Sequence, residues 1–298
     1  MYVISVVPLK RGIGLDTLSY FSNQEFQKGT ILSIPVRNTL VLGLVTDINE
    51  VSTAKTALRA ATFSLRKLPL QKDPSILSDA YIRTAQYLSQ YYAAPLGTIL
   101  YNLLPPDVRS GDIPLPHTHH VPQSSTHAPQ ILTGPKRERF VAYRSLVRET
   151  FAHSGSVLFV VPSSVEADEL RDALSHGIED RIIMLTTAMT KAQLKKSYDT
   201  LGDFSKTKLI ISTPSHSLIE RHDITHVTIE HARSPYYKEL VRPYIDYRDA
   251  LRIHSEYTGR KLIFGDLIMR TEEEELRRTE IYTTFDDSRK RVDLQGEL

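Results

Sequence analysis

The stretch ILTGPKRERF, residues 131–140, contains a glycine followed by three cations, the residue types that bind phosphate. A complete phosphate-binding loop reads G-x-x-x-x-G-K-S/T. Its glycines let backbone N–H groups approach phosphate, its lysine reaches the outer phosphates and its hydroxyl holds magnesium. Here Gly134 lacks a second glycine, Pro135 removes an N–H donor, and no G-K-S or G-K-T tripeptide occurs in the chain. The stretch is therefore a poor match to a working phosphate-binding loop.

The charged residues near this loop leave two interpretations open. Lys136, Arg137 and Arg139 could attract an anion, because the N-terminus of a helix favours negative charge. They could equally form a basic, solvent-exposed first turn. Glu230 and His231 follow an apolar run and could supply a general base, although an ordinary loop pair is the commoner situation.

Composition restricts the remaining chemistry. The 298 residues are 41% apolar and 24% charged, with a net charge of +2, which is typical of a soluble globular protein. The absence of cysteine excludes disulfides and thiolate zinc sites. Four histidines between positions 117 and 127 lie in a proline-rich stretch without carboxylates, so we predict no metal there.

Two further patterns concern partners. No apolar run reaches 18 residues, and the first 15 residues have the reverse charge order of a secretory signal. We therefore expect a cytoplasmic protein with no membrane partner. Residues 55–72 hold five basic residues and no acidic one. Such a stretch is an electrostatic footprint for nucleic acid or, as often, a solvated face.

The N-terminal part contains short β-type runs at 2–7, 30–36 and 40–48. The last two flank Arg37-Asn38-Thr39, a hairpin-length connection with an asparagine that is able to take a positive φ angle. A small barrel or sandwich is predicted, followed by a helix that Ser78 caps.

The C-terminal part alternates short apolar runs with helical segments, which indicates a doubly wound, largely parallel α/β sheet. Ligands of such folds bind at the carboxyl ends of the strands. The runs lie at residues 157–161, 182–185, 209–212, 226–229 and 261–265. We predict a β-rich domain with C-terminal helices over 1–108, a Pro/His/Ser-rich linker over 109–129, an α/β lobe over 130–285 and a connector over 286–298.

Several segments, in order, resemble the PriA family of primosomal replication-restart helicases over essentially the whole chain. The most specific is YLSQYYAAPLGTILYNLLPPDVR, residues 87–109. The others are TLSYFSN (17–23), KGTILSIPV (28–36), VLGLVTDI (41–48), LRAATFSL (58–65), VLFVVPS (157–163), SPYYK (234–238) and YRDALRI (247–253). The resemblance implies a DNA-binding domain for the 3′ end of a nascent strand at a stalled fork, followed by a RecA-like helicase lobe.

The resemblance places the pocket for the DNA 3′ end at Leu18, Ser19, Tyr20, Arg37 and Arg59. Leu18 and Ser19 replace an aromatic and an acidic residue of the family. Base stacking and a carboxylate acceptor for the 3′ hydroxyl are therefore lost. The charges of Arg37 and Arg59 are kept and could bind the phosphate backbone.

The same resemblance places the family's phosphate loop at residues 131–140, its D-E-E-H box at 230–233 and its G-S-A-T switch at 265–268. The ligands of phosphate and magnesium are missing together. The degenerate nucleotide-site positions are Gly134, Lys136, Arg137, Arg139, Glu230 and His231.

We therefore predict a DNA-binding protein of replication restart whose lobe does not hydrolyse ATP and needs no cofactor or metal. Its partners are forked DNA with a nascent 3′ end, and other primosome or single-stranded-DNA-binding proteins. One alternative is an active ATP-dependent helicase whose ATP and magnesium site is completed by a second lobe or a partner chain. Another is an α/β enzyme that acts through Glu230 and His231.

Overall fold

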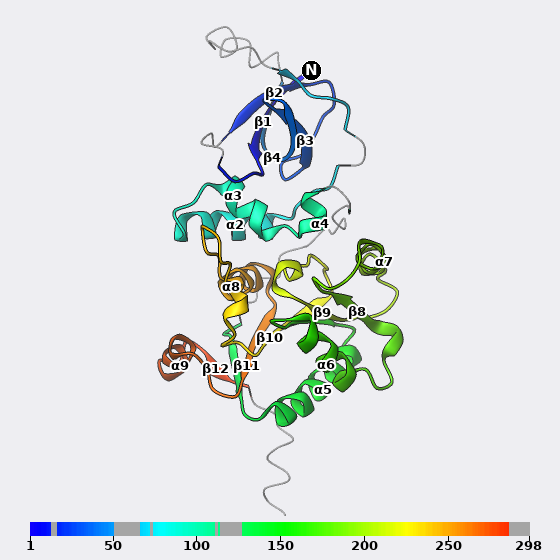
Figure 1. Ribbon diagram of the computed structural model, residues 1–298, viewed down its shortest axis with the longest axis vertical. Coiled ribbons are helices and arrows are strands. Elements are labelled where there is room, and N and C mark those ends of the chain that lie inside the picture. The colour runs from blue at the N-terminus through cyan, green and yellow to red at the C-terminus, as the bar shows by residue number, and fades with distance from the viewer. Residues whose placement is uncertain (13–16, 51–65, 72–73, 111–112, 114–126, 286–298) are drawn as a thin grey trace, which may run out of the picture. The chain divides into compact units, whose positions relative to one another are not determined.

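The computed structural model describes residues 1–12, 17–50, 66–71, 74–110, 113 and 127–285 (Figure 1). The chain divides into two compact units. The first comprises Met1–His120 with Leu240–Ile245, and the second comprises Val121–Glu239 with Asp246–Leu298. Each unit has its own sheet and core. Among the residues that the structure describes, no helix is long and apolar enough to cross a membrane.

The first unit is built on a curled five-stranded sheet in the order β3-β4-β1-β2-β5 (Figure 1). The neighbouring strands are antiparallel except for the parallel pair β2 and β5. Alternate residues face inward, as a strand requires, and form a core of which Ile4, Leu32 and Ile34 are at most 1% exposed. The strands are β1 (Tyr2–Pro8), β2 (Leu18–Ser22), β3 (Ile31–Val36), β4 (Thr39–Glu50) and β5 (Arg66–Lys67).

The connection between β3 and β4 is the expected hairpin, with Val36 paired to Thr39. The positive φ angle in this turn belongs to Arg37, at 54°, and not to Asn38. Both residues are exposed, and the Arg37 carbonyl accepts a hydrogen bond from Arg66 Nη1 at 3.0 Å.

Three helices follow the sheet: α2 (Asp79–Tyr91), α3 (Leu96–Leu103) and α4 (Pro106–Arg109). Ser78 caps α2 as predicted, because its Oγ accepts a hydrogen bond from the Tyr81 N–H at 3.1 Å. Helix α3 packs closely on β1, since a Cβ at Gly97 would lie 2.1 Å from the Pro8 carbonyl oxygen. The β-rich part and its helices thus share one packed unit.

The second unit contains a seven-stranded sheet in the order β12-β6-β11-β10-β7-β9-β8, in which every neighbouring pair is parallel. The five predicted apolar runs form β7 to β11, whereas β6 and β12 were not predicted. The strands are β6 (Gln130–Thr133), β7 (Ser156–Val160), β8 (Ile182–Leu185), β9 (Leu209–Ser212), β10 (Ile224–Glu230), β11 (Lys261–Asp266) and β12 (Thr283–Thr284).

Helices cover both faces of this sheet, so the predicted doubly wound α/β fold class is confirmed (Figure 1). A core cluster joins α5 and α6 to β7, β9 and β11 through residues such as Leu146, Leu170, Phe159 and Ile263. The helices are α5 (Lys136–Ala152), α6 (Ser164–Leu174), α7 (Lys191–Leu201), α8 (Tyr247–Thr258) and α9 (Thr271–Arg278).

Candidate nucleic-acid interface

Strand β2 carries three of the residues assigned to the 3′-end pocket. Tyr20 is 4% exposed and belongs to the core of the first unit. Its hydroxyl donates a hydrogen bond to the Pro35 carbonyl at 2.9 Å. Burial raises the pKa of Tyr20, and the charge of Arg66 partly opposes this. The Tyr20 ring therefore fixes β2 against β3 from inside the sheet.

The other two assigned residues, Leu18 and Ser19, lie on opposite sides of strand β2. Leu18 is half-buried and packs against the same core cluster as Tyr20. Because side chains alternate along a strand, Ser19 lies on the outer side, at half-buried accessibility. Of the three assigned residues on β2, Ser19 is thus the one placed to meet a ligand outside the core.

The turn after β3 brings cations next to this strand. Arg37 is exposed, and its carbonyl accepts a hydrogen bond from Arg66 Nη1 at 3.0 Å. Arg66 and Lys67 form β5, which pairs with β2 at Tyr20 and Phe21, and both are exposed. We call these three residues, Arg37, Arg66 and Lys67, the basic rim. Arg59, the fifth pocket residue, lies outside the described residues.

Arg66 and Lys67 were not assigned to the pocket from sequence. The available signal was the run of basic residues between positions 55 and 72, which contains both. The run does not say which cations lie beside β2. The parallel pairing of β5 with β2 supplies that information.

In the second unit, the phosphate-loop stretch forms the end of β6, a turn and the start of α5. Gly134 has a φ angle of 141°, and its N–H donates a hydrogen bond to the Asp266 carbonyl at 3.1 Å. Helix α5 begins directly after Pro135, without a side-chain cap. The turn is therefore tied to the end of β11 rather than open around a ligand.

Arg139, on the first turns of α5, points into the protein. It is 5% exposed, and its Nε donates a hydrogen bond to Glu230 Oε2 at 3.1 Å. Its Nη2 also binds Glu230 Oε1, and its Nη1 binds the Gly134 carbonyl. Burial acts to lower the pKa of Arg139, but the hydrogen bond and charge of Glu230 outweigh it and raise that pKa. The side chain is not placed to meet DNA phosphate.

Tyr143 completes this buried cluster. Its hydroxyl donates a hydrogen bond to Glu230 Oε2 at 2.6 Å. Burial, together with the charge of Glu230, raises the pKa of Tyr143 well above its usual value, so the phenol remains a donor. Gly265 leaves the space for it, since a Cβ there would lie 1.8 Å from the Tyr143 hydroxyl oxygen. We call Arg139, Tyr143 and Glu230 the buried cluster.

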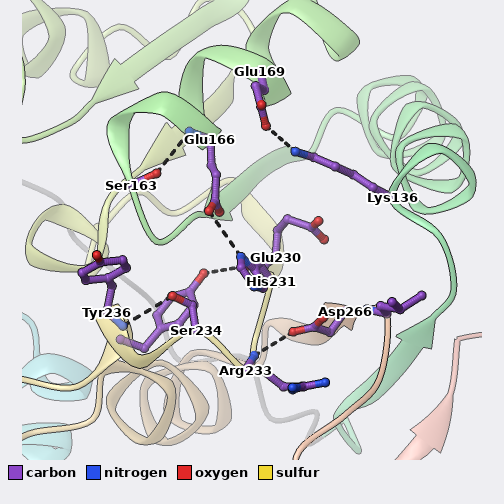
Figure 2. A network of polar contacts seen from close by, with 12 residues as sticks. Lys136, Ser163, Glu166, Glu169, Glu230, His231, Arg233, Ser234, Tyr236 and Asp266 are labelled. Carbon is purple, nitrogen blue, oxygen red and sulfur yellow. Dashed lines mark hydrogen bonds and ion pairs between the residues drawn. The ribbon is translucent and has the colours of Figure 1, made fainter.

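The remaining degenerate nucleotide-site residues lie at the surface. Lys136 forms an ion pair with Glu169, and the imidazole Nδ1 of His231 lies 3.3 Å from Glu166 Oε1 (Figure 2). Arg137 is exposed. Glu230 is therefore buried against Arg139 and Tyr143, whereas His231 is exposed and lies beside Glu166, so the two residues do not form a hydrogen-bonded dyad. Within the described ranges, no group of three or more His, Asp and Glu side chains could hold a metal ion.

Residues 6–105 match the family model of the PriA 3′ DNA-binding domain. The chain is 23% identical over 262 residues to the replication restart protein PriA of Helicobacter pylori strain 26695, and 24% identical over 264 residues to that of strain J99. Each match covers 84% of this chain and 40% of the relative. The chain thus spans about 40% of the length of these relatives.

Two solved structures resemble parts of the chain. The C-terminal domain of Saccharomyces cerevisiae Dbp5 matches at 12% identity and a TM-score of 0.41, over 57% of this chain and 96% of that one. The Escherichia coli DExH-box NTPase HrpB matches at 14% identity and a TM-score of 0.35, over 76% of this chain and 25% of that one.

The family match falls on the unit that carries the basic rim, and the similarity to the relatives extends along most of the chain into the second unit. The predicted resemblance is therefore confirmed: residues 6–105 match the family model of the PriA 3′ DNA-binding domain, and the chain is similar to the replication restart protein PriA of Helicobacter pylori over 84% of its length.

Proposed function

We propose that this chain is a DNA-binding protein of replication restart and that its second unit neither binds nor hydrolyses ATP. The observation that supports DNA binding is the match of residues 6–105 to the 3′ DNA-binding domain. The basic rim supplies cations for the phosphate backbone, the main source of affinity in protein–DNA contacts. The DNA is forked, with the 3′ end of a nascent strand near β2.

The buried cluster supports the second half of the proposal. ATP needs a free cation for its outer phosphates, and magnesium needs a free carboxylate. Arg139 and Glu230 are the nearest equivalents here, and they are bonded to each other with side chains 5% and 4% exposed. ATP with magnesium does not fit these residues without breaking a buried ion pair. In this proposal Arg139 and Glu230 form a structural contact inside the protein and not a nucleotide site.

We also propose that this protein recognises the 3′ end of DNA only weakly. Leu18 packs inward and Ser19 is a neutral hydroxyl, so neither stacks on the terminal base or offers a carboxylate to the 3′ hydroxyl. Binding then depends mainly on phosphate contacts, which are salt-dependent. We also propose that the protein acts in the cytoplasm. Its further partners in this proposal are primosome proteins and single-stranded-DNA-binding proteins.

A titration of labelled forked DNA tests this function. Two forks are compared, one with a free 3′ hydroxyl and one blocked by a 3′ phosphate, at several salt concentrations. We expect similar affinities for both forks and a steep loss of affinity with salt. Full preference for the free 3′ hydroxyl would contradict the interpretation of Ser19, and a lack of binding to either fork would contradict the proposal itself.

A further inference from the structure

The exposed face of α2 carries two tyrosine rings one helical turn apart. Tyr87 is 37% exposed and Tyr91 is 63% exposed. Their ring centroids lie 6.3 Å apart, with the ring planes 14° from parallel. Residues four apart project from the same side of a helix, so the two rings form one aromatic surface.

The two rings are held in position before any ligand arrives. Tyr91 makes an edge contact with Tyr92, at a centroid distance of 4.9 Å and an interplanar angle of 90°. On the opposite face of α2, Ala85 and Leu88 are fully buried. A rigid aromatic ring on an anchored helix loses little conformational entropy on binding. The surface is therefore suited to contact a flat ligand.

A cation that can contact a polyanion lies near these rings. Arg83 lies one turn before Tyr87, and its guanidinium is 3.9 Å from Asp79, with both side chains more than half exposed. An exposed ion pair at that distance contributes little and can rearrange. From Ala80 to Pro106 the sequence contains no acidic residue. The exposed amides of Gln86 and Gln90 flank the rings.

We propose that the α2 face, formed by Arg83, Gln86, Tyr87, Gln90 and Tyr91, binds single-stranded DNA by stacking bases on the two tyrosine rings. Arg83 meets a neighbouring phosphate. Stacking on aromatic rings tolerates any sequence because every base has a π face. This proposal rests on the DNA binding proposed above. It adds that the bound DNA is single-stranded and that a second surface, distinct from the basic rim, contacts it.

The exposed ring faces favour a single strand over a duplex. A base can stack on an aromatic ring only where its own π face is accessible, as it is in a single strand. A duplex keeps its bases stacked within the helix and offers only its edges and backbone to the same surface.

A single-tryptophan variant tests the contact directly. The chain has no tryptophan, so Tyr91→Trp places one indole on the α2 face. We expect saturable quenching of its fluorescence by oligo-dT and little quenching by a duplex of equal length. The matched control is Ile281→Trp in the second unit, where the side chain is 55% exposed. Its emission should stay unchanged.

A second measurement uses affinity. Tyr87→Ala with Tyr91→Ala should weaken oligo-dT binding, followed by anisotropy of the labelled strand, by at least about 5-fold for each ring. Tyr87→Phe with Tyr91→Phe keeps both rings and should bind as the wild type does. Circular dichroism checks that α2 remains folded in both variants.

The outcomes separate this proposal from the one on which it rests. Wild-type affinity in the double alanine variant, or an unquenched Tyr91→Trp in the presence of bound oligo-dT, would overturn the α2 face and leave DNA binding standing. Failure of the wild-type chain to bind either oligo-dT or forked DNA would overturn both. Equal quenching of Tyr91→Trp and Ile281→Trp would also refute the α2 face, since it would show unspecific contact.

Discussion

Removal of one partner from the buried cluster should destabilise the second unit alone. In Arg139→Met the guanidinium is replaced by an apolar side chain of similar length, and Glu230, 3% exposed, is left without its cation. Breaking a buried ion pair in this way costs about 3–5 kcal/mol. The Tyr143 hydroxyl still donates to Glu230 but cannot neutralise its charge. We expect a loss in this range.

Hydrogen exchange measured by mass spectrometry locates the effect. Strands β7 and β10 contain fully buried residues and report on the second unit, while β1 and β4 report on the first. A loss of 3–5 kcal/mol speeds exchange through global opening by about two to three and a half orders of magnitude. The change should be confined to β7, β10 and their neighbours.

Two further variants make this prediction specific. Arg144→Met changes an exposed arginine on the same helix and should leave exchange within a few-fold of the wild type. Adding Glu230→Gln to Arg139→Met should recover part of the loss, because the uncompensated charge is removed. Wild-type exchange of β7 and β10 in Arg139→Met would refute the interpretation of the buried cluster.

Three other predictions follow from the same structure. Alanine at Arg37, Arg66 and Lys67 should weaken DNA binding. It should also reduce the slope of log binding constant against log salt concentration by about 0.9 for each lost duplex phosphate contact. Alanine at the exposed Lys195 and Lys196 is the control and should change neither quantity. Gly265→Ala should destabilise the second unit, because the new Cβ would lie 1.8 Å from the Tyr143 hydroxyl oxygen, whereas Gly202→Ala has no contact closer than 3.5 Å and serves as the control in thermal melts. Burial and, to a smaller extent, the charge of Lys261 lower the pKa of His226 to about 4 in the folded protein. As pH falls from 6.5 towards 4, His226 is therefore protonated in the unfolded chain before it is protonated in the folded one, and stability should fall. The loss should reach about 3 kcal/mol in denaturant titrations and disappear in His226→Asn.

The parallel sheet could be predicted because its central strands are fully buried. Strands β7 and β9 are buried at every position, which produces short, continuous apolar runs in the sequence. Strands β6 and β12 were missed because neither is buried along its length: β6 has two buried residues and β12 has none, so neither forms a continuous apolar run. Their assignment depends on pairing with β11 and with each other, which no local pattern reveals.

Local capping was predicted well, since it depends on neighbouring residues. Ser78 begins α2 as expected, and its Oγ accepts a hydrogen bond from the Tyr81 N–H. The same kind of contact occurs at α6, where Ser163 Oγ accepts a hydrogen bond from the Glu166 N–H at 3.3 Å. Burial is less local: Glu273 on α9 stands in a run of four glutamates, yet it is 2% exposed and accepts a hydrogen bond from Arg270 Nε at 2.9 Å.

The candidate sites could be predicted only in part. The sequence indicates that residues 131–140 and 230–233 have lost nucleotide ligands, but not that Arg139 and Glu230, 91 residues apart, meet. That contact is produced by β6 and β10 flanking β11, an arrangement visible only in the sheet order. Likewise, Tyr20 was assigned to a pocket, and its inward direction depends on the strand register.

The most direct test of the central claim measures DNA binding and phosphate release together. Labelled forked DNA is titrated with the wild-type chain in the presence of ATP and magnesium, with anisotropy reporting the bound DNA and a phosphate sensor reporting hydrolysis. We predict saturable DNA binding with no phosphate release above that of the DNA alone. Fork-stimulated phosphate release that is abolished by Arg139→Ala would contradict the account and support an active helicase.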